Sequence, residues 1–167
     1  MKLFPGDPGG SVCWADPETE MTIATIIVNY NAGETLQHCV GALLNSTEPT
    51  SLTVVDNASS DHSAESLQSL YGKHRDVEIL VNPTNTGFAP AVNSVARGLK
   101  SDWILILNPD CIMEQETLGR LKAALLGDSK AGLAGPAVRD EDGQLQRATM
   151  RRFPGPWKSL MTASGLW

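Results

Sequence analysis

The chain has 167 residues, the length of one ordinary domain, and its thirteen Lys and Arg against nineteen Asp and Glu give a net charge of −6. Hydrophobic residues make up 41% and charged residues 19%, so the chain is too apolar to be disordered, and it can bury roughly 70% of its unfolded surface without disulfides. The negative charge disfavours a nucleic-acid partner bound through backbone electrostatics, and the longest apolar runs are too short to span a bilayer.

Residues 1–21 are predicted to be a loose leader, because Pro, Gly and acidic residues stand where a signal peptide has its apolar core. Periodic structure begins directly after Met21, so one hypothesis makes Met21 the natural start and residues 1–20 an upstream extension. The cysteines, Cys13, Cys39 and Cys111, have no CxxC spacing. They are typical of reduced thiols in a cytosolic protein and do not resemble a zinc site or a disulfide framework.

From residue 22 on, short apolar runs alternate with amphipathic segments. Strands are predicted at residues 23–28, 52–55, 77–81 and 103–107. Between and after them, helices are predicted from four apolar faces: Leu36, Val40, Leu43 and Leu44; Ala64, Leu67, Leu70 and Tyr71; Phe88, Ala91, Val92, Val95, Ala96 and Leu99; and Leu118, Leu121 and Leu125.

This alternation predicts an α/β fold whose mainly parallel sheet is covered by helices on both faces. The run WILIL at residues 103–107 is predicted to be buried on both faces. A further strand is predicted at residues 132–138, and DEDG at residues 140–143 is predicted to be a turn. The predicted domain covers residues 22–150, and residues 151–167 are interpreted as the start of a further segment.

Polar side chains follow every predicted strand, at the edge where parallel sheets bind ligands. They are Asn29-Tyr30-Asn31, the run 56–61 (DNASSD), the run 82–87 (NPTNTG) and Asn108-Pro109-Asp110. Such residues also make turns and cap helices without any ligand, and Asp61 or Ser60 is a candidate cap for the second helix. The occurrence of all these polar segments at one edge of the predicted sheet is what favours a binding site.

Neither GxGxxG nor GxxxxGK[ST] is present, which argues against a small dinucleotide-binding oxidoreductase or a P-loop protein. An acidic protein that binds a phosphorylated ligand needs another source of positive charge, and a divalent cation on a carboxylate is the usual one. Asp110, just after the WILIL strand, is the predicted ligand. Oxygen ligands and a diphosphate suit Mg²⁺ or Mn²⁺.

Taken together, the motifs resemble glycosyltransferase family 2, in its rhamnosyltransferase-like branch. The resemblance rests on IIVNYN (26–31), VVDNASSD (54–61), NPTNTGFAPAVN (82–93) and LILNPD (105–110), supported by DEDGQL (140–145) and RRFP (151–154). It implies a GT-A fold, a Rossmann-like sheet that binds a nucleotide-diphospho-sugar.

The resemblance also implies roles for single residues. Tyr30 would lie near the nucleoside, and Asp56 with Asn57 would contact the base or ribose. Asn85, Gly87 and Asn93 would shape the wall of the donor pocket. Asp110 would hold Mg²⁺ or Mn²⁺ where the family has its DxD motif, whose first Asp is Asn108 here. The full predicted nucleotide-sugar site is Val28, Tyr30, Asn31, Asp56, Asn57, Asn85, Gly87, Phe88, Asn93, Asn108 and Asp110.

Members of that family are longer, and their second half brings the acceptor site and the general base of inverting enzymes. No counterpart of that base is found after Asp110, so the fold is predicted to be truncated and the catalytic base is unknown. The expected function is transfer of a sugar, rhamnose by analogy, from a dTDP- or UDP-linked donor to a saccharide or lipid-linked acceptor in cell-surface polysaccharide synthesis. The alternative is a non-catalytic nucleotide-sugar-binding fragment.

The expected location is cytoplasmic, with peripheral contact at the inner face of the plasma membrane as an option. Missing strands would leave an open sheet edge and apolar surface, so self-association through that side is predicted.

Overall fold

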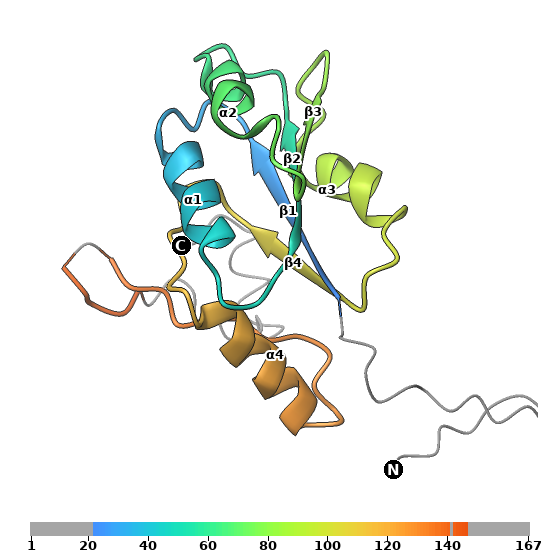
Figure 1. The fold of residues 1–167 in the computed structure, drawn as a ribbon, viewed down its shortest axis with the longest axis vertical. Coiled ribbons are helices and arrows are strands. Elements are labelled where there is room, and N and C mark those ends of the chain that lie inside the picture. The colour runs from blue at the N-terminus through green and yellow to red at the C-terminus, as the bar shows by residue number, and fades with distance from the viewer. Residues whose placement is uncertain (1–21, 141, 147–167) are drawn as a thin grey trace, which may run out of the picture. The chain divides into compact units, whose positions relative to one another are not determined.

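The four predicted strands form one parallel sheet in the computed structural model, which describes residues 22–140 and 142–146 (Figure 1). In chain order the elements are β1 (Ile23–Asn29), α1 (Thr35–Leu44), β2 (Ser51–Asp56), α2 (Ser63–Tyr71), β3 (Val77–Val81), α3 (Phe88–Ala96), β4 (Trp103–Leu107) and α4 (Thr117–Gly127). The predicted α/β fold is therefore confirmed, and β3 and β4 have the predicted bounds.

The strand order is β3-β2-β1-β4, so the chain steps outward from β1 to β3 and then crosses back to the other side of β1. Right-handed crossovers place the helices of the outward steps on one face and the helix of the return step on the other. Accordingly α1 and α2 lie on one side of the sheet and α3 on the opposite side (Figure 1). The order reverses between β1 and β4.

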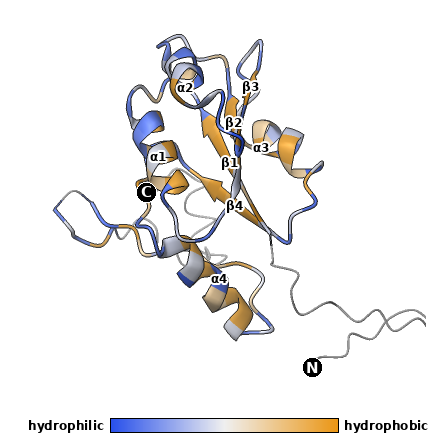
Figure 2. Cartoon of the chain, in the orientation of Figure 1, coloured by the Kyte–Doolittle hydropathy of each residue, from blue (hydrophilic) through white to orange (hydrophobic). Residues whose placement is uncertain are grey.

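Each face of the sheet has its own core. The larger core packs the sheet against α1 and α2 and includes Ile27, Leu36, Val40, Leu43, Val54 and Leu67. The smaller one packs Ile26, Val28 and Val55 against Ala91 and Val92 of α3. All seven residues of the central strand β1 are buried. Figure 2 shows the strands as mainly hydrophobic and the loops at their ends as largely hydrophilic.

The prediction that WILIL is buried on both faces is wrong. Ile104 and Ile106 of β4 are 45% and 51% exposed. They share register with Ala24 and Ile26 and so lie on the α3 side of the sheet. The main contacts of α3 are with β1 and β2, which leaves this side of β4 open within the described residues.

Smaller differences concern the helix faces. Leu70, on the apolar face from which the second helix is predicted, is 61% exposed at the end of α2, and Phe88, on that of the third helix, is 50% exposed at the start of α3. The third helix ends at Ala96, before the predicted Leu99. Leu99 still packs, partly buried, against the smaller core.

The chain divides into two compact units, Met1–Leu118 and Gly119–Trp167. Within the second unit the predicted strand at residues 132–138 is absent. Its neighbourhood instead forms a single antiparallel bridge between Arg139 and Leu145. The turn between them is confirmed, since the Gly143 N–H donates to the Asp140 carbonyl at 2.9 Å. The leader at residues 1–21 and the segment 151–167 lie outside the described residues.

Candidate functional site

The carboxyl edge of the sheet at β1 and β4 is the point where the strand order reverses. Open parallel sheets bind ligands at such a reversal, because the connections from the two neighbouring strands leave in opposite directions. The segments Asn29-Tyr30-Asn31 and Asn108-Pro109-Asp110 follow these two strands. The fold therefore brings the first and last predicted motifs to neighbouring strand ends at one edge of the sheet.

Asn29, fully buried at the end of β1, is the centre of the edge. Its side-chain nitrogen lies 2.7 Å from Asp56 Oδ1, 2.8 Å from Ser63 Oγ and 3.1 Å from Ser59 Oγ. Its backbone carbonyl accepts the Asn57 N–H at 2.8 Å. Asn29 thus ties β1 to the end of β2 and the start of α2. It belongs to the first motif, but it is not among the predicted site residues.

Asp56, the predicted nucleoside contact, is 2% exposed. One carboxylate oxygen accepts the Asn29 amide, and the other accepts the Ser59 N–H at 3.1 Å. Hydrogen-bond donors surround this buried carboxylate where an ion pair would otherwise be needed. The neighbouring Tyr30 is 55% exposed and open to a ligand.

The loop after β1 is locked to the loop after β2. Asn31 has a left-handed backbone (φ 55°), its N–H donates to Ser59 Oγ at 3.0 Å, and its side-chain oxygen accepts the Ser60 N–H at 2.8 Å. The carboxylate of Asp61 accepts the Gly33 N–H at 2.7 Å and the Ser63 hydroxyl at 2.6 Å. These bonds, first of all the one from Ser63, lower the pKa of Asp61.

Asp61 also accepts the Ser63 N–H at 3.1 Å, in a side-chain turn that leads into α2. The N-cap position itself is His62, which makes no side-chain cap bond, so neither Asp61 nor Ser60 is the helix cap that the sequence suggests. The hydroxyl of Ser63 connects Asp61 to Asn29, because it accepts from the amide and donates to the carboxylate.

Asn57 organises the loop between β3 and α3, and it is 2% exposed. Its side-chain nitrogen donates to Asn85 Oδ1 at 2.8 Å. Its side-chain oxygen accepts the Asn82 amide at 3.1 Å and the Thr86 N–H at 3.0 Å. The Asn85 oxygen also accepts the Gly87 N–H at 2.9 Å. Three predicted site residues, Asn57, Asn85 and Gly87, are therefore brought together.

The segment after β4 carries an exposed carboxylate, Asp110, beside two thiols. Cys111 Sγ lies 3.7 Å from Asp110 Oδ1, and Cys39 Sγ lies 3.5 Å from the Asn108 carbonyl. Burial, with smaller effects of Cys111 and Asp110, raises the pKa of the Cys39 thiol to about 12. Burial and the Asp110 carboxylate also raise the pKa of Cys111. Both thiols are therefore protonated at neutral pH and poor nucleophiles.

The chemistry of Asp110 fits Mg²⁺ or Mn²⁺. These ions take oxygen ligands, and Mg²⁺ is commonly held by one or two carboxylates with water and substrate phosphates completing the shell. Within the described residues, no three His, Cys, Asp or Glu side chains gather into a ready-made metal cage. Asp110 is thus suited to a site that a diphosphate would complete.

The remaining predicted site residues have varied surroundings. The Val28 side chain is 7% exposed and packs in the α3 core, so it cannot face a ligand. Phe88 and Asn93 lie on α3 and are exposed, and Asn108 is exposed after β4.

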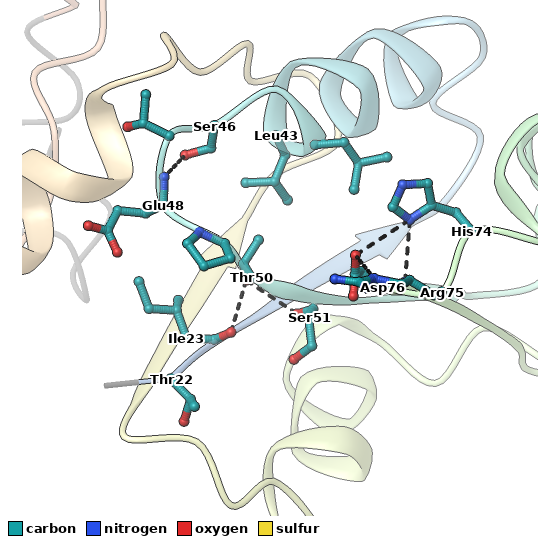
Figure 3. Close-up of a pocket in the computed structure, with 13 residues that line it drawn as sticks. Thr22, Ile23, Leu43, Ser46, Glu48, Thr50, Ser51, His74, Arg75 and Asp76 are labelled. Carbon is teal, nitrogen blue, oxygen red and sulfur yellow. Dashed lines mark hydrogen bonds and ion pairs between the residues drawn. The ribbon is translucent and has the colours of Figure 1, made fainter. Parts of the chain in front are cut away.

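A hollow of about 470 Å³ lies at the opposite, amino edge of the sheet (Figure 3). Its lining includes Thr22, Thr50, Ser51, Arg75 and Asp76. Arg75 pairs with Asp76 at 3.2 Å, so the charge of this arginine is already balanced within the protein. The hollow lacks the convergent strand-end groups of the carboxyl edge and is not the candidate site.

Comparison with known proteins bears on these motifs. The sequence profile of the family described as Glycosyl transferase family 2 matches residues 24–166. An N-acetylglucosaminyl-diphospho-decaprenol L-rhamnosyltransferase of Mycobacterium tuberculosis is 27% identical over 135 residues, which cover 74% of this chain and 43% of that protein. The chain thus spans less than half the length of this relative.

Solved structures share the fold. A mannosyltransferase, PcManGT from Pyrobaculum calidifontis, in complex with GDP-Man and Mn²⁺, superposes with a TM-score of 0.60 at 21% identity, over 74% of this chain and 35% of its own. TarS 1–349 of S. aureus, in complex with UDP-GlcNAc, gives a TM-score of 0.57 at 17% identity, over 72% and 39%. No helix that the structure describes is long and apolar enough to cross a membrane.

Proposed function

The chain belongs to glycosyl transferase family 2 and has the GT-A fold, and from that premise we propose that it binds a nucleotide-diphospho-sugar and takes part in transferring the sugar to a saccharide or lipid-linked acceptor. The observation that carries the proposal is the meeting of two motifs at the β1–β4 reversal, one with the Asn29–Asp56 pair and one with Asp110. Nucleoside recognition and diphosphate binding both need polar groups, and ligands of open parallel sheets bind at such a reversal.

We propose a dTDP- or UDP-linked donor, with rhamnose as the sugar. The similarity to a mycobacterial L-rhamnosyltransferase supports the sugar, and its diphospho-decaprenol substrate supports a lipid-linked acceptor. The UDP-GlcNAc and GDP-Man complexes of two structural neighbours support a nucleotide-sugar donor in general.

The roles proposed for Tyr30, Asp56 and Asp110 follow from the exposure and charge of their side chains. Tyr30, 55% exposed, would stack on the nucleoside. Asp56 is 2% exposed and both of its oxygens accept hydrogen bonds within the protein, so it would support the nucleoside site by holding Asn29 in place and not by the direct contact that the sequence predicts. Asp110 would hold Mg²⁺ or Mn²⁺ against the diphosphate. The ion would offset negative charge on the leaving diphosphate, acting as a Lewis acid.

The transfer is proposed to invert the anomeric centre, which requires a base at the acceptor hydroxyl. Among the described acidic residues after Asp110, Asp140 is engaged in its own turn, where it accepts the Gln144 N–H at 2.8 Å. The chain also spans only 43% of the mycobacterial relative. The catalytic base therefore stays unassigned, and the alternative is a non-catalytic nucleotide-sugar-binding fragment that lacks the acceptor half and the base.

Calorimetric titration of the chain with dTDP and with UDP, each with and without Mn²⁺, tests the proposal. Metal-dependent binding of one nucleotide is expected, and the preferred nucleotide narrows the donor. A folded chain that binds neither would contradict the proposed function. A transfer assay with a nucleotide-sugar and a saccharide acceptor then separates the enzyme from the non-catalytic fragment.

A further inference from the structure

We propose that Asn57 is a positioning residue of the donor site, which holds the loop 82–87 and the start of α3 in place and does not itself contact the donor. This inference rests on the proposed function for its link to the donor, but its structural half can be tested without any ligand.

The Asn57 side chain has no exposed group to offer a ligand. It is 2% exposed, its nitrogen donates to Asn85, and its oxygen accepts from the Asn82 amide and from both the N–H and the hydroxyl of Thr86. A buried amide engaged on both its donor and its acceptor side is satisfied within the protein. The second hydrogen of the side-chain nitrogen is enclosed with the rest of the side chain, so a contact with the nucleotide-sugar through it would require the surrounding loops to move.

All the partners of this side chain lie in one loop. Asn82, Asn85 and Thr86 belong to the segment between β3 and α3, while Asn57 directly follows β2. The backbone repeats the link, because the Asn82 N–H donates to the Asp56 carbonyl at 2.8 Å. Asn57 therefore joins the ends of two neighbouring strands.

The bond to Asn85 carries the effect to α3. The Asn85 oxygen accepts from the Asn57 amide and from the Gly87 N–H together. Gly87 has φ 86° and ψ 164° and immediately precedes α3. This residue sets the direction in which the helix leaves the edge, and the helix carries the exposed Phe88 and Asn93. Fixing Asn85 thus fixes Phe88 and Asn93, two residues of the predicted nucleotide-sugar site.

The network predicts that the same change, from Asn to Asp, has different effects at positions 57 and 85. Asn57→Asp places an acceptor opposite the Asn85 oxygen, so the Asn85 amide must turn to donate, and the Gly87 N–H then loses its acceptor. Asn85→Asp keeps an oxygen for both the Asn57 amide and the Gly87 N–H. The Thr86 N–H keeps its acceptor in both variants, whereas Asn57→Ser, whose side chain is too short, removes it.

Hydrogen exchange of single backbone amides, followed by NMR on the whole chain, measures the loss of these hydrogen bonds without a ligand. We expect the Gly87 amide to exchange about tenfold faster in Asn57→Asp, with Thr86 unchanged, and both amides to exchange faster in Asn57→Ser. In Asn85→Asp both should exchange at wild-type rates. Thr25→Val is the matched control, since it removes a buried hydroxyl bonded to Thr50 at 2.8 Å at the opposite edge.

Titration with dTDP and UDP in the presence of Mn²⁺ provides the second measurement. Nucleotide affinity should fall in Asn57→Asp and Asn57→Ser, and it should fall further in the variant whose Gly87 amide exchanges faster. Thr25→Val should bind like the wild type. Lower affinity with wild-type exchange at Gly87 and Thr86 would mean that Asn57 contacts the donor and would overturn the inference. Loosened amides with unchanged affinity would also overturn it.

Failure of the proposed function gives a different result. In that case the wild-type chain binds neither nucleotide, and the exchange rates alone still show whether Asn57 holds the loop. Wild-type exchange rates in all three site variants would overturn the structural half.

Discussion

Side-chain amides and hydroxyls, with two carboxylates as acceptors, hold the carboxyl edge of the sheet together. Asn29 and Asn57 are both buried there. Each connects a strand end to a following loop through hydrogen bonds of 2.7–3.1 Å. The ion pair of His62 with Glu65, by contrast, lies at an exposed position. Buried bonds of this kind need no oppositely charged side chain, and salt screens them little.

Asp110→Asn tests the proposed metal ligand at this scale. The side chain is exposed, so the free energy of unfolding should change by no more than about 0.5 kcal/mol. Mn²⁺-dependent binding of UDP or dTDP should weaken by at least about tenfold, because the amide oxygen carries no charge to hold the ion. Calorimetry and thermal melting measure the two effects. Glu78→Gln, an equal charge change at an exposed position of β3, is the control, and equal losses of Tm and binding would make Asp110 structural.

Asp61 gives a prediction about pH. Its pKa is lowered in the folded chain by the Ser63 and Gly33 bonds, so the folded state favours the ionised form. That stabilisation is present above the unfolded pKa and is lost as the pH falls through the lowered folded pKa. Asp61→Asn should therefore be less stable than the wild type at pH 7, and the two should converge below about pH 4. Urea unfolding of both proteins across this pH range measures the difference in their free energies of unfolding. A difference that does not change with pH would contradict the role assigned to Asp61.

The site could be predicted from the sequence in its location but only partly in its residue roles. Polar residues after apolar strands suffice to place Asn57, Asn85 and Asp110 at one edge, because parallel strands all end there. Burial decides the roles, and the pattern does not give it. Asn29 and Asn57 are buried and bonded inward, while Tyr30 beside them is 55% exposed. An Asn as the last residue of a strand, followed by a Ser-rich loop, was the available signal for Asn29.

At the scale of elements, the loops at this edge contain unusual backbone conformations. Asn31, Ala58 and His62 have positive φ although none is glycine. All three lie in the loops after β1 and β2. Such conformations persist where surrounding bonds enforce them, as the Ser59 and Ser60 contacts do for Asn31.

Ala58→Gly is expected to stabilise the chain. Ala58 has φ 64°, a conformation that costs an L-residue about 1–2 kcal/mol. Glycine removes that cost but adds about 0.5–1 kcal/mol of unfolded-chain entropy. The net gain should be up to about 1.5 kcal/mol, seen as a higher urea midpoint at constant m-value. A lower midpoint would show that the Ala58 methyl group makes packing contacts worth more than the strain.

Gly87→Ala should have the opposite effect. At φ 86° and ψ 164° the residue is in a region that glycine alone adopts readily. A Cβ added at this position would meet only Pro90 Cδ, at an ordinary 3.8 Å, so the cost comes from the backbone. We expect a loss of about 1–3 kcal/mol, or a shift of the start of α3 that lowers nucleotide affinity. Gly127→Ala, at a position with open space and no positive φ, is the control; equal effects would contradict the argument.

The periodicity of the sequence predicted all eight elements, because each helix and strand has its own repeat of apolar residues. The periodicity also predicted a strand at residues 132–138, which is absent, and the burial of both faces of WILIL, which is wrong. A continuous apolar run signals a strand, but whether both faces are covered depends on where the neighbouring helices cross. Here α3 returns over β1 and β2, and the α3 side of β4 is left open within the described residues.

For the whole molecule, the open face predicts self-association of the chain. Ile104 and Ile106 are 45% and 51% exposed on the same face of β4, which ends the described sheet. An apolar edge strand is a template for a second copy. Light scattering against concentration should show oligomers, and Ile104→Thr with Ile106→Thr should reduce them while keeping β-propensity. Leu70→Thr, which removes an exposed leucine from α2, should leave association unchanged. A monomer at high concentration would show that this face is covered.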